Sequence, residues 1–186
     1  NEINRMLIIG MLLKKAMKGS IDIMTPYQDI LNNKPLSIEE KCQTFDDEII
    51  LVENIKKIFL LLLGKAFDKY GSEIEKNQQV LLSLSDLAIE AYLSESTLKR
   101  TIKNIKRSSV EDQFDQINMT KLYIYEACQI VLKKSNDVVN SIIDLKSQDK
   151  VHSSIAGKLK YSENPNIFEL KTKIAEKIIS ENRYCF

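Results

Sequence analysis

The longest uninterrupted helical pattern in the sequence runs from Gln78 to Ile105. Apolar side chains recur there every three or four residues, so they fall on one face of an α-helix, and neither Gly nor Pro interrupts the run. This stripe consists of Val80, Leu84, Leu87, Ala91, Leu98, Ile102 and Ile105. Small side chains at Ala88, Ala91 and Ser94 let a neighbouring helix approach closely. The pattern predicts a long helix around which the rest of the chain packs.

The composition favours helices throughout the chain. Of the 186 residues, 44% are hydrophobic and 28% are charged, which suffices for one domain with a substantial core. The chain has only five Gly and three Pro, so long helices with short connections are favoured over sheets. We therefore expect an all-α fold, built as an antiparallel bundle of long helices.

Five further stretches carry a helical period, and they cover residues 1–18, 45–70, 114–145, 147–160 and 167–182. Helix 45–70 is apolar nearly all round from Ile58 to Leu63, which predicts a central position. Gly64 lies inside the same helix, where glycine costs about 1 kcal/mol relative to alanine unless close packing requires it. Helix 114–145 is predicted to lie antiparallel to helix 78–105, across a short connection.

The apolar faces of three of these helices are also predicted. The inward face of helix 1–18 is predicted to be Ile3, Met6, Leu7, Gly10, Leu13 and Met17. That of helix 114–145 is predicted to be Ile117, Ile124, Cys128, Val131, Ser135, Val138 and Ile142. That of the last helix is predicted to be Ile167, Leu170, Ile174 and Ile178. Between residues 20 and 44 the pattern is broken, and Ser37 with Glu40 is typical of a capping box. The tail 183–186 is predicted to dock on the rest.

Charge and cysteine usage exclude several classes of function. The 27 Lys and Arg residues balance 26 Asp and Glu residues, so the net charge indicates no polyanionic partner. The basic run at the end of helix 78–105 has no interleaved aromatic residues, so we expect a solvated helix end and no nucleic acid. Cys42, Cys128 and Cys185 are widely spaced, which argues against a disulfide framework or a zinc site and fits a cytoplasmic protein. His152 is the single histidine and is predicted to lie at the surface.

Membrane attachment is expected to be weak or absent. The most apolar run, Ile58 to Leu63, is far shorter than the roughly 20 residues that cross a bilayer. Between residues 20 and 48, seven acidic residues stand against two basic ones, and the resulting charge of −5 should be repelled by anionic lipid.

The first nineteen residues, NEINRMLIIGMLLKKAMKG, resemble the terminal helix of the flavin-dependent acyl-CoA dehydrogenases. In that family the helix follows the motif Glu-Gly-Thr-Asn-Glu-Ile, and Asn1, Glu2 and Ile3 match its last three positions. The first Glu of the motif removes the α-proton of the acyl-CoA while flavin N5 accepts the β-hydride. The resemblance implies that this base lies just upstream of Asn1. This chain alone is therefore expected to lack the catalytic base, and we predict no catalytic residue in it.

Other segments resemble the additional helical C-terminal domain of the very-long-chain branch of that family, in a bacterial form. They are Leu82 to Thr101, Gly19 to Met24 and Glu181 to Phe186. The resemblance implies three regions: a terminal helix of the catalytic core (1–19), a linker with short helices (20–44) and a C-terminal helical bundle (45–186). The implied role in fatty acid β-oxidation is architectural, supporting the catalytic core and the contacts of a homodimer. The implied electron acceptor is an electron-transferring flavoprotein.

Glu2 is the only candidate cofactor-binding residue, because the family places the end of its motif near FAD. A carboxylate can accept a hydrogen bond from a ribose or ribityl hydroxyl, although a favourable position at the helix N-terminus explains Glu2 equally well. FAD is expected in the parent protein and not tightly bound to this chain alone, and no metal is expected. The alternatives left open are a free-standing helical scaffold or interaction module, and a self-contained enzyme.

Overall fold

The computed structural model describes residues 2–34 and 41–183, and over these ranges the chain is helical and contains no strand. Its α-helices are α1 (Glu2–Met17), α2 (Met24–Leu31), α3 (Asp46–Tyr70), α4 (Gln78–Ile105), α5 (Phe114–Ile142), α6 (Leu145–Lys158) and α7 (Ile167–Glu181). Short 3-10 turns precede α3, α4 and α5 at Gln43–Phe45, Gly71–Lys76 and Glu111–Gln113. The prediction of an all-α fold is confirmed for the described ranges.

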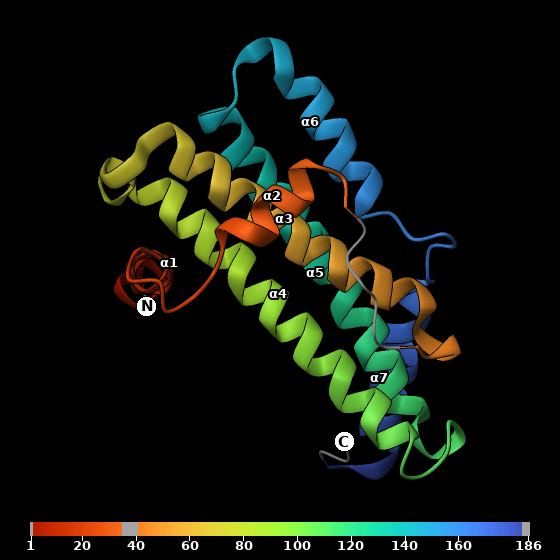
Figure 1. Cartoon of the computed structure of the whole chain (residues 1–186). Helices are drawn as coiled ribbons and strands as arrows, with labels where there is room; N and C mark the ends of the chain where they lie inside the picture. Colours follow the sequence, from red (N-terminus) through yellow and green to blue (C-terminus); the bar gives the residue numbers. More distant parts are fainter. Residues whose placement is uncertain (1, 35–40, 184–186) are drawn as a thin grey trace.

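Helices α3, α4 and α5 pack side by side and form the centre of the fold (Figure 1). The predicted stripe of α4 is buried except for Ile105, which is half-buried, and the whole predicted stripe of α5 is buried. From Ile58 to Leu63 each residue of α3 is buried or half-buried, as its central position requires. Periodicity and all-round hydrophobicity therefore identified the core correctly.

Helices α4 and α5 are antiparallel, as predicted. Near the end of α4, the hydroxyl oxygens of Thr101 and Thr120 lie 2.8 Å apart, and Thr120 also donates to the carbonyl of Gln116 at 2.7 Å. Near its start, Lys134 Nζ lies 2.9 Å from a carboxylate oxygen of Asp86. Ser94 is fully buried between these two contacts, where a larger side chain would separate the helices.

Helices α6 and α7 cover α5 from outside the central trio. His152, predicted at the surface, is instead half-buried on α6: its ring nitrogens Nδ1 and Nε2 lie 2.7 and 2.9 Å from the side-chain oxygens of Asn136 and Asn140. Both asparagines belong to α5, so the side chain of His152 connects α6 to α5 through these two contacts. The predicted inward face of α7 is half-buried except for Ile178, which is 40% exposed because α7 packs only lightly on the bundle.

The predicted inward face of α1 is partly wrong. Ile3, Leu7 and Met17 are 71%, 51% and 72% exposed, whereas Ile9 and Leu13 are 0% and 6% exposed. Helix α1 is apolar on nearly every side, so its periodicity does not single out one face. In Figure 1 it is seen end-on while α4 runs across the view, so α1 crosses α4 steeply and much of its surface stays uncovered.

Several predictions fall on residues outside the described ranges, namely the capping box of Ser37 and Glu40 and the tail residues Tyr184 to Phe186. Arg183, the last described residue, is exposed and lies 3.7 Å from a carboxylate oxygen of Glu181. Within the described ranges, none of the helices combines the length and hydrophobicity that spanning a bilayer requires. In the same ranges, Cys42 and Cys128 are free thiols, and the ligand-type side chains form no cluster that could hold a metal ion.

Candidate functional site

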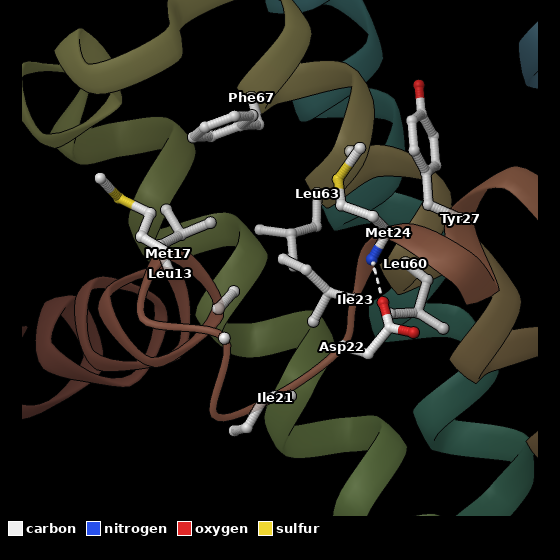
Figure 2. A pocket seen from close by; sticks show the side chains of 13 residues that line it. Leu13, Met17, Ile21, Asp22, Ile23, Met24, Tyr27, Leu60, Leu63 and Phe67 are labelled. Atoms are coloured by element: carbon white, nitrogen blue, oxygen red, sulfur yellow. Dashed lines mark hydrogen bonds between the residues drawn. The ribbon is translucent and has the colours of Figure 1, made fainter.

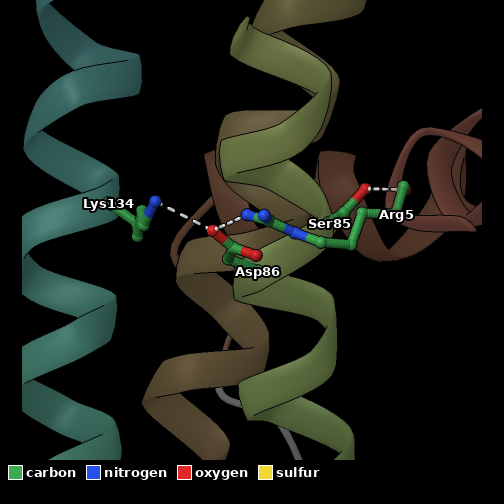
Figure 3. A network of polar contacts seen from close by, with 4 residues as sticks. All are labelled: Arg5, Ser85, Asp86 and Lys134. Carbon is green, nitrogen blue, oxygen red and sulfur yellow. Dashed lines mark hydrogen bonds and ion pairs between the residues drawn. The ribbon is translucent and has the colours of Figure 1, made fainter. Parts of the chain in front are cut away.

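The inner side of α1 is fastened to the bundle by a polar network (Figure 3). The Asp86 carboxylate on α4 receives Arg5 from α1 on one side and Lys134 from α5 on the other. The hydroxyl of Ser85 donates to the backbone carbonyl of Arg5. Asp86 is only 16% exposed, and the two basic side chains are 31% and 30% exposed, so these ion pairs are partly shielded from water. One carboxylate thus links three helices.

Asp86→Asn is expected to destabilise the chain by roughly 1–2 kcal/mol, because the isosteric amide cannot pair two cations. The loss should shrink at high salt, and urea unfolding at two salt concentrations measures it. The exposed Asp137→Asn on α5 is the matched control and should change stability by less than about 0.5 kcal/mol. Equal effects of the two substitutions would show that the network does not hold α1.

The outer side of α1 is apolar and exposed. Ile3, Leu7 and Met11 recur at intervals of four residues and are 71%, 51% and 54% exposed. Contiguous exposed apolar surface is uncommon on a protein that works alone and indicates an interaction site. Since the other side of α1 is anchored through Arg5, this outer stripe is presented on a fixed helix.

Glu2, the predicted flavin contact, lies in the exposed first turn of α1. At a rise of 1.5 Å per residue, Glu2 lies roughly 16 Å along the axis of α1 from Leu13, which lines the apolar hollow described next. Among the described residues, Glu2 lines neither this apolar hollow nor the hollow that adjoins it. Its contact with FAD therefore stays a prediction.

An apolar hollow of about 390 Å³ lies between the end of α1, the segment containing α2, and α3 (Figure 2). We call it the first hollow. Its walls include Leu13, Ile23, Leu60, Leu63 and Phe67. Asp22 also lines it, but its carboxylate accepts the backbone N–H groups of Met24 and Thr25 at 3.0 Å and so begins α2. The hollow therefore favours apolar groups.

Tyr27 fixes α2 against α3 beside this hollow. It is the only buried residue of α2, and its hydroxyl donates to Asp68 at 2.6 Å. Its ring lies directly over Gly64, where an added Cβ would stand 2.5 Å from two ring carbons. Burial and the neighbouring carboxylate raise the pKa of the Tyr27 hydroxyl. Close packing thus explains the glycine inside α3.

A buried carboxyl lies at the start of α3. Glu48 is 3% exposed, and burial raises its pKa, while the charge of Lys121 acts in the opposite direction. Burial and the charge of Glu48 raise the pKa of the Cys128 thiol to about 12. A thiol that stays protonated is a poor nucleophile. Cys128 is therefore a core residue, as its place in the stripe of α5 predicted.

The buried Glu48 makes stability depend on pH. Its pKa is raised in the folded state, so the folded chain keeps a proton that the unfolded chain releases once the pH exceeds about 4.5, the ordinary value. The contribution of Glu48 to stability is therefore lost as the pH rises from there through the raised pKa. Glu48→Gln should gain on the order of 1 kcal/mol at pH 7 and remove this decline. Chemical unfolding between pH 4 and pH 8 measures both effects.

The exposed Glu163→Gln is the control for Glu48→Gln, because it changes the same group at the rim of the same region. It should leave the pH profile unchanged. A Glu48→Gln variant less stable than the parent chain at pH 7 would show that the carboxylate is needed in its charged form.

Comparison with known proteins identifies the family. The family model of the acyl-CoA dehydrogenase C-terminal domain matches residues 54–156, which run from α3 into α6. The chain belongs to this family, which confirms the resemblance at that level.

Two relatives match nearly the whole chain. A probable acyl-CoA dehydrogenase from Bacillus subtilis (strain 168) is 26% identical over 188 residues, covering 99% of this chain and 31% of the relative. The crystal structure of an acyl-CoA dehydrogenase complexed with FAD from Bacillus anthracis superimposes with a TM-score of 0.91 at 28% identity, over 100% of this chain and 32% of that one. The chain thus spans about a third of the length of these relatives.

Proposed function

We propose that this chain is the C-terminal helical part of an FAD-dependent acyl-CoA dehydrogenase and that its own role is architectural. The observation that carries the proposal is the match of the whole chain to one third of an FAD-bound acyl-CoA dehydrogenase. The remaining two thirds of such a protein would supply the flavin cleft and the catalytic base, so this chain contributes packing surface.

The anchored helix α1 supports the architectural role. Its inner side is fixed by Arg5 and by the buried Ile9, and its outer stripe of Ile3, Leu7 and Met11 is exposed. We propose that the catalytic core packs on this outer stripe. Burying three large apolar side chains would contribute several kcal/mol, at roughly 1.5–3 kcal/mol each.

The finer assignments follow from the resemblance. We propose that the parent protein is of the very-long-chain type, acts in fatty acid β-oxidation, forms homodimers and passes electrons to an electron-transferring flavoprotein. When bound, FAD would accept the hydride from the acyl-CoA. Glu2 would lie at the edge of that site and accept a hydrogen bond from a cofactor hydroxyl.

The coding sequence upstream of Asn1 tests the proposal at little cost. A Glu-Gly-Thr triplet directly before Asn1, preceded by a segment of roughly twice the length of this chain, is expected. An open reading frame that starts at or just before Asn1 would contradict the proposal and favour a free-standing helical scaffold.

A further inference from the structure

A second hollow adjoins the first. It measures about 580 Å³ and lies between the last turn of α1, the end of α3 and the 3-10 turn Gly71–Lys76. The two hollows share Leu13, Met17 and Phe67 as a common wall. Met17 is 72% exposed, and its flexible thioether side chain can move without disturbing the core. A single extended molecule can therefore occupy both hollows.

The two hollows differ in charge. Lys14 and Lys18 line the second hollow and face one acidic residue there, Glu75. Neither lysine forms an ion pair with another described residue. In the first hollow the one carboxylate, Asp22, already caps α2. The pair of hollows therefore offers an apolar chamber beside an entrance with an excess of positive charge.

The segment that covers the first hollow is held at few points. Gly19 and Asn33 have positive φ angles of 70° and 54° at its two ends, and each closes the preceding helix with a left-handed residue. Between them, Tyr27 is the one buried side chain of α2. The cover is thus a short strap that Tyr27 holds on α3.

We propose that the two hollows form a binding site for a single-chain anionic amphiphile, such as a monomeric long-chain fatty carboxylate. The tail lies in the first hollow, between Ile23 and Leu63, and the carboxylate lies in the second, between Lys14 and Lys18. This site is separate from the exposed turn at Glu2 and does not depend on the proposed function.

The test measures binding of palmitate, below its critical micelle concentration, to the 186-residue chain. Binding is detected as displacement of the fluorescent fatty acid dansyl-undecanoate. Ala16→Trp places an indole in the first hollow and should abolish binding. The matched control is Ala175→Trp on the exposed side of α7, which should bind as the parent chain does.

The headgroup is tested by charge. Lys14→Glu with Lys18→Glu should weaken palmitate binding about tenfold, the effect of two partly screened charges, and should leave binding of the uncharged hexadecanol unchanged. Lys15→Glu on the same helix turn does not line either hollow and serves as the control. Should Ala16→Trp fail to fold, Met24→Trp fills the same hollow from its exposed rim.

Three results would overturn the proposal. The first is unchanged palmitate binding in Ala16→Trp and in Met24→Trp, and the second is an equal loss of binding with Lys15→Glu. The third is a chain that binds vesicles of anionic lipid, measured in parallel, but does not bind palmitate. The last result would assign the lysines to a membrane surface. None of these results bears on whether the parent protein is a flavin enzyme, so the two proposals fail separately.

Discussion

Gly64→Ala is expected to destabilise the chain by about 1–3 kcal/mol, although the same substitution usually stabilises a helix. The added Cβ would lie 2.5 Å from Cδ2 and Cε2 of Tyr27 and 2.7 Å from Cγ, so the whole ring must move. Moving the ring also breaks the hydroxyl contact with Asp68 and releases the strap over the first hollow. Urea unfolding measures the free energy, and hydrogen exchange of α2 measures the release.

Two controls isolate the cause of this effect. Gly157→Ala lies in α6 with open space around its Cβ, so it should stabilise by roughly 0.5–1 kcal/mol. In a Tyr27→Ala background the steric conflict is gone, and Gly64→Ala should then be neutral or stabilising. A destabilising effect that persists in that background would contradict the assigned role of Tyr27.

Charging the outer stripe of α1 should prevent this C-terminal part from packing on the catalytic core of the full-length protein. Leu7→Asp with Met11→Asp changes two exposed side chains, so the 186-residue chain should keep its stability within about 0.5 kcal/mol per substitution. In the full-length product the same pair would bury two unpaired charges against the catalytic core, at several kcal/mol each. The yield of soluble, flavin-bound full-length enzyme should therefore fall sharply, which purification and the flavin absorbance spectrum measure.

The control for the outer stripe is Leu145→Asp, at the start of α6, where the leucine is 83% exposed. This variant should fold and hold flavin in both the chain and the full-length product. If Leu7→Asp with Met11→Asp leaves the full-length enzyme intact, the outer stripe of α1 does not face the catalytic core.

Helices α4 and α5 could be predicted because each has one continuous apolar face, which the neighbouring helices cover. The whole predicted stripe of α5 is buried, and the predicted stripe of α4 departs only at Ile105. Helix α1 has no such bias, so Ile3 and Leu7 were wrongly predicted to face inward. A helical period of apolar residues identifies the buried face only when the opposite face is polar. It cannot identify the buried face of a helix that is apolar all round.

The contacts around the candidate site join residues that are far apart in the chain. Arg5 and Asp86 are 81 positions apart, and Tyr27 and Asp68 are 41 positions apart. No local pattern links such residues, although Gly64 inside an apolar helix was a signal of close packing. The resemblance rests partly on Asn1 to Ile3, which lie outside the family match at residues 54–156. That match does include the whole of the segment Leu82 to Thr101, on which the resemblance also rests.

FAD content and acyl-CoA dehydrogenase activity, measured with an artificial electron acceptor, would decide whether this chain is part of a flavin enzyme. The full-length gene product and the 186-residue chain are compared under the same conditions. We expect bound flavin and activity in the full-length product and neither in the chain alone. A full-length product that binds no flavin and oxidises no acyl-CoA would show that this chain is not the C-terminal part of a flavin-dependent dehydrogenase.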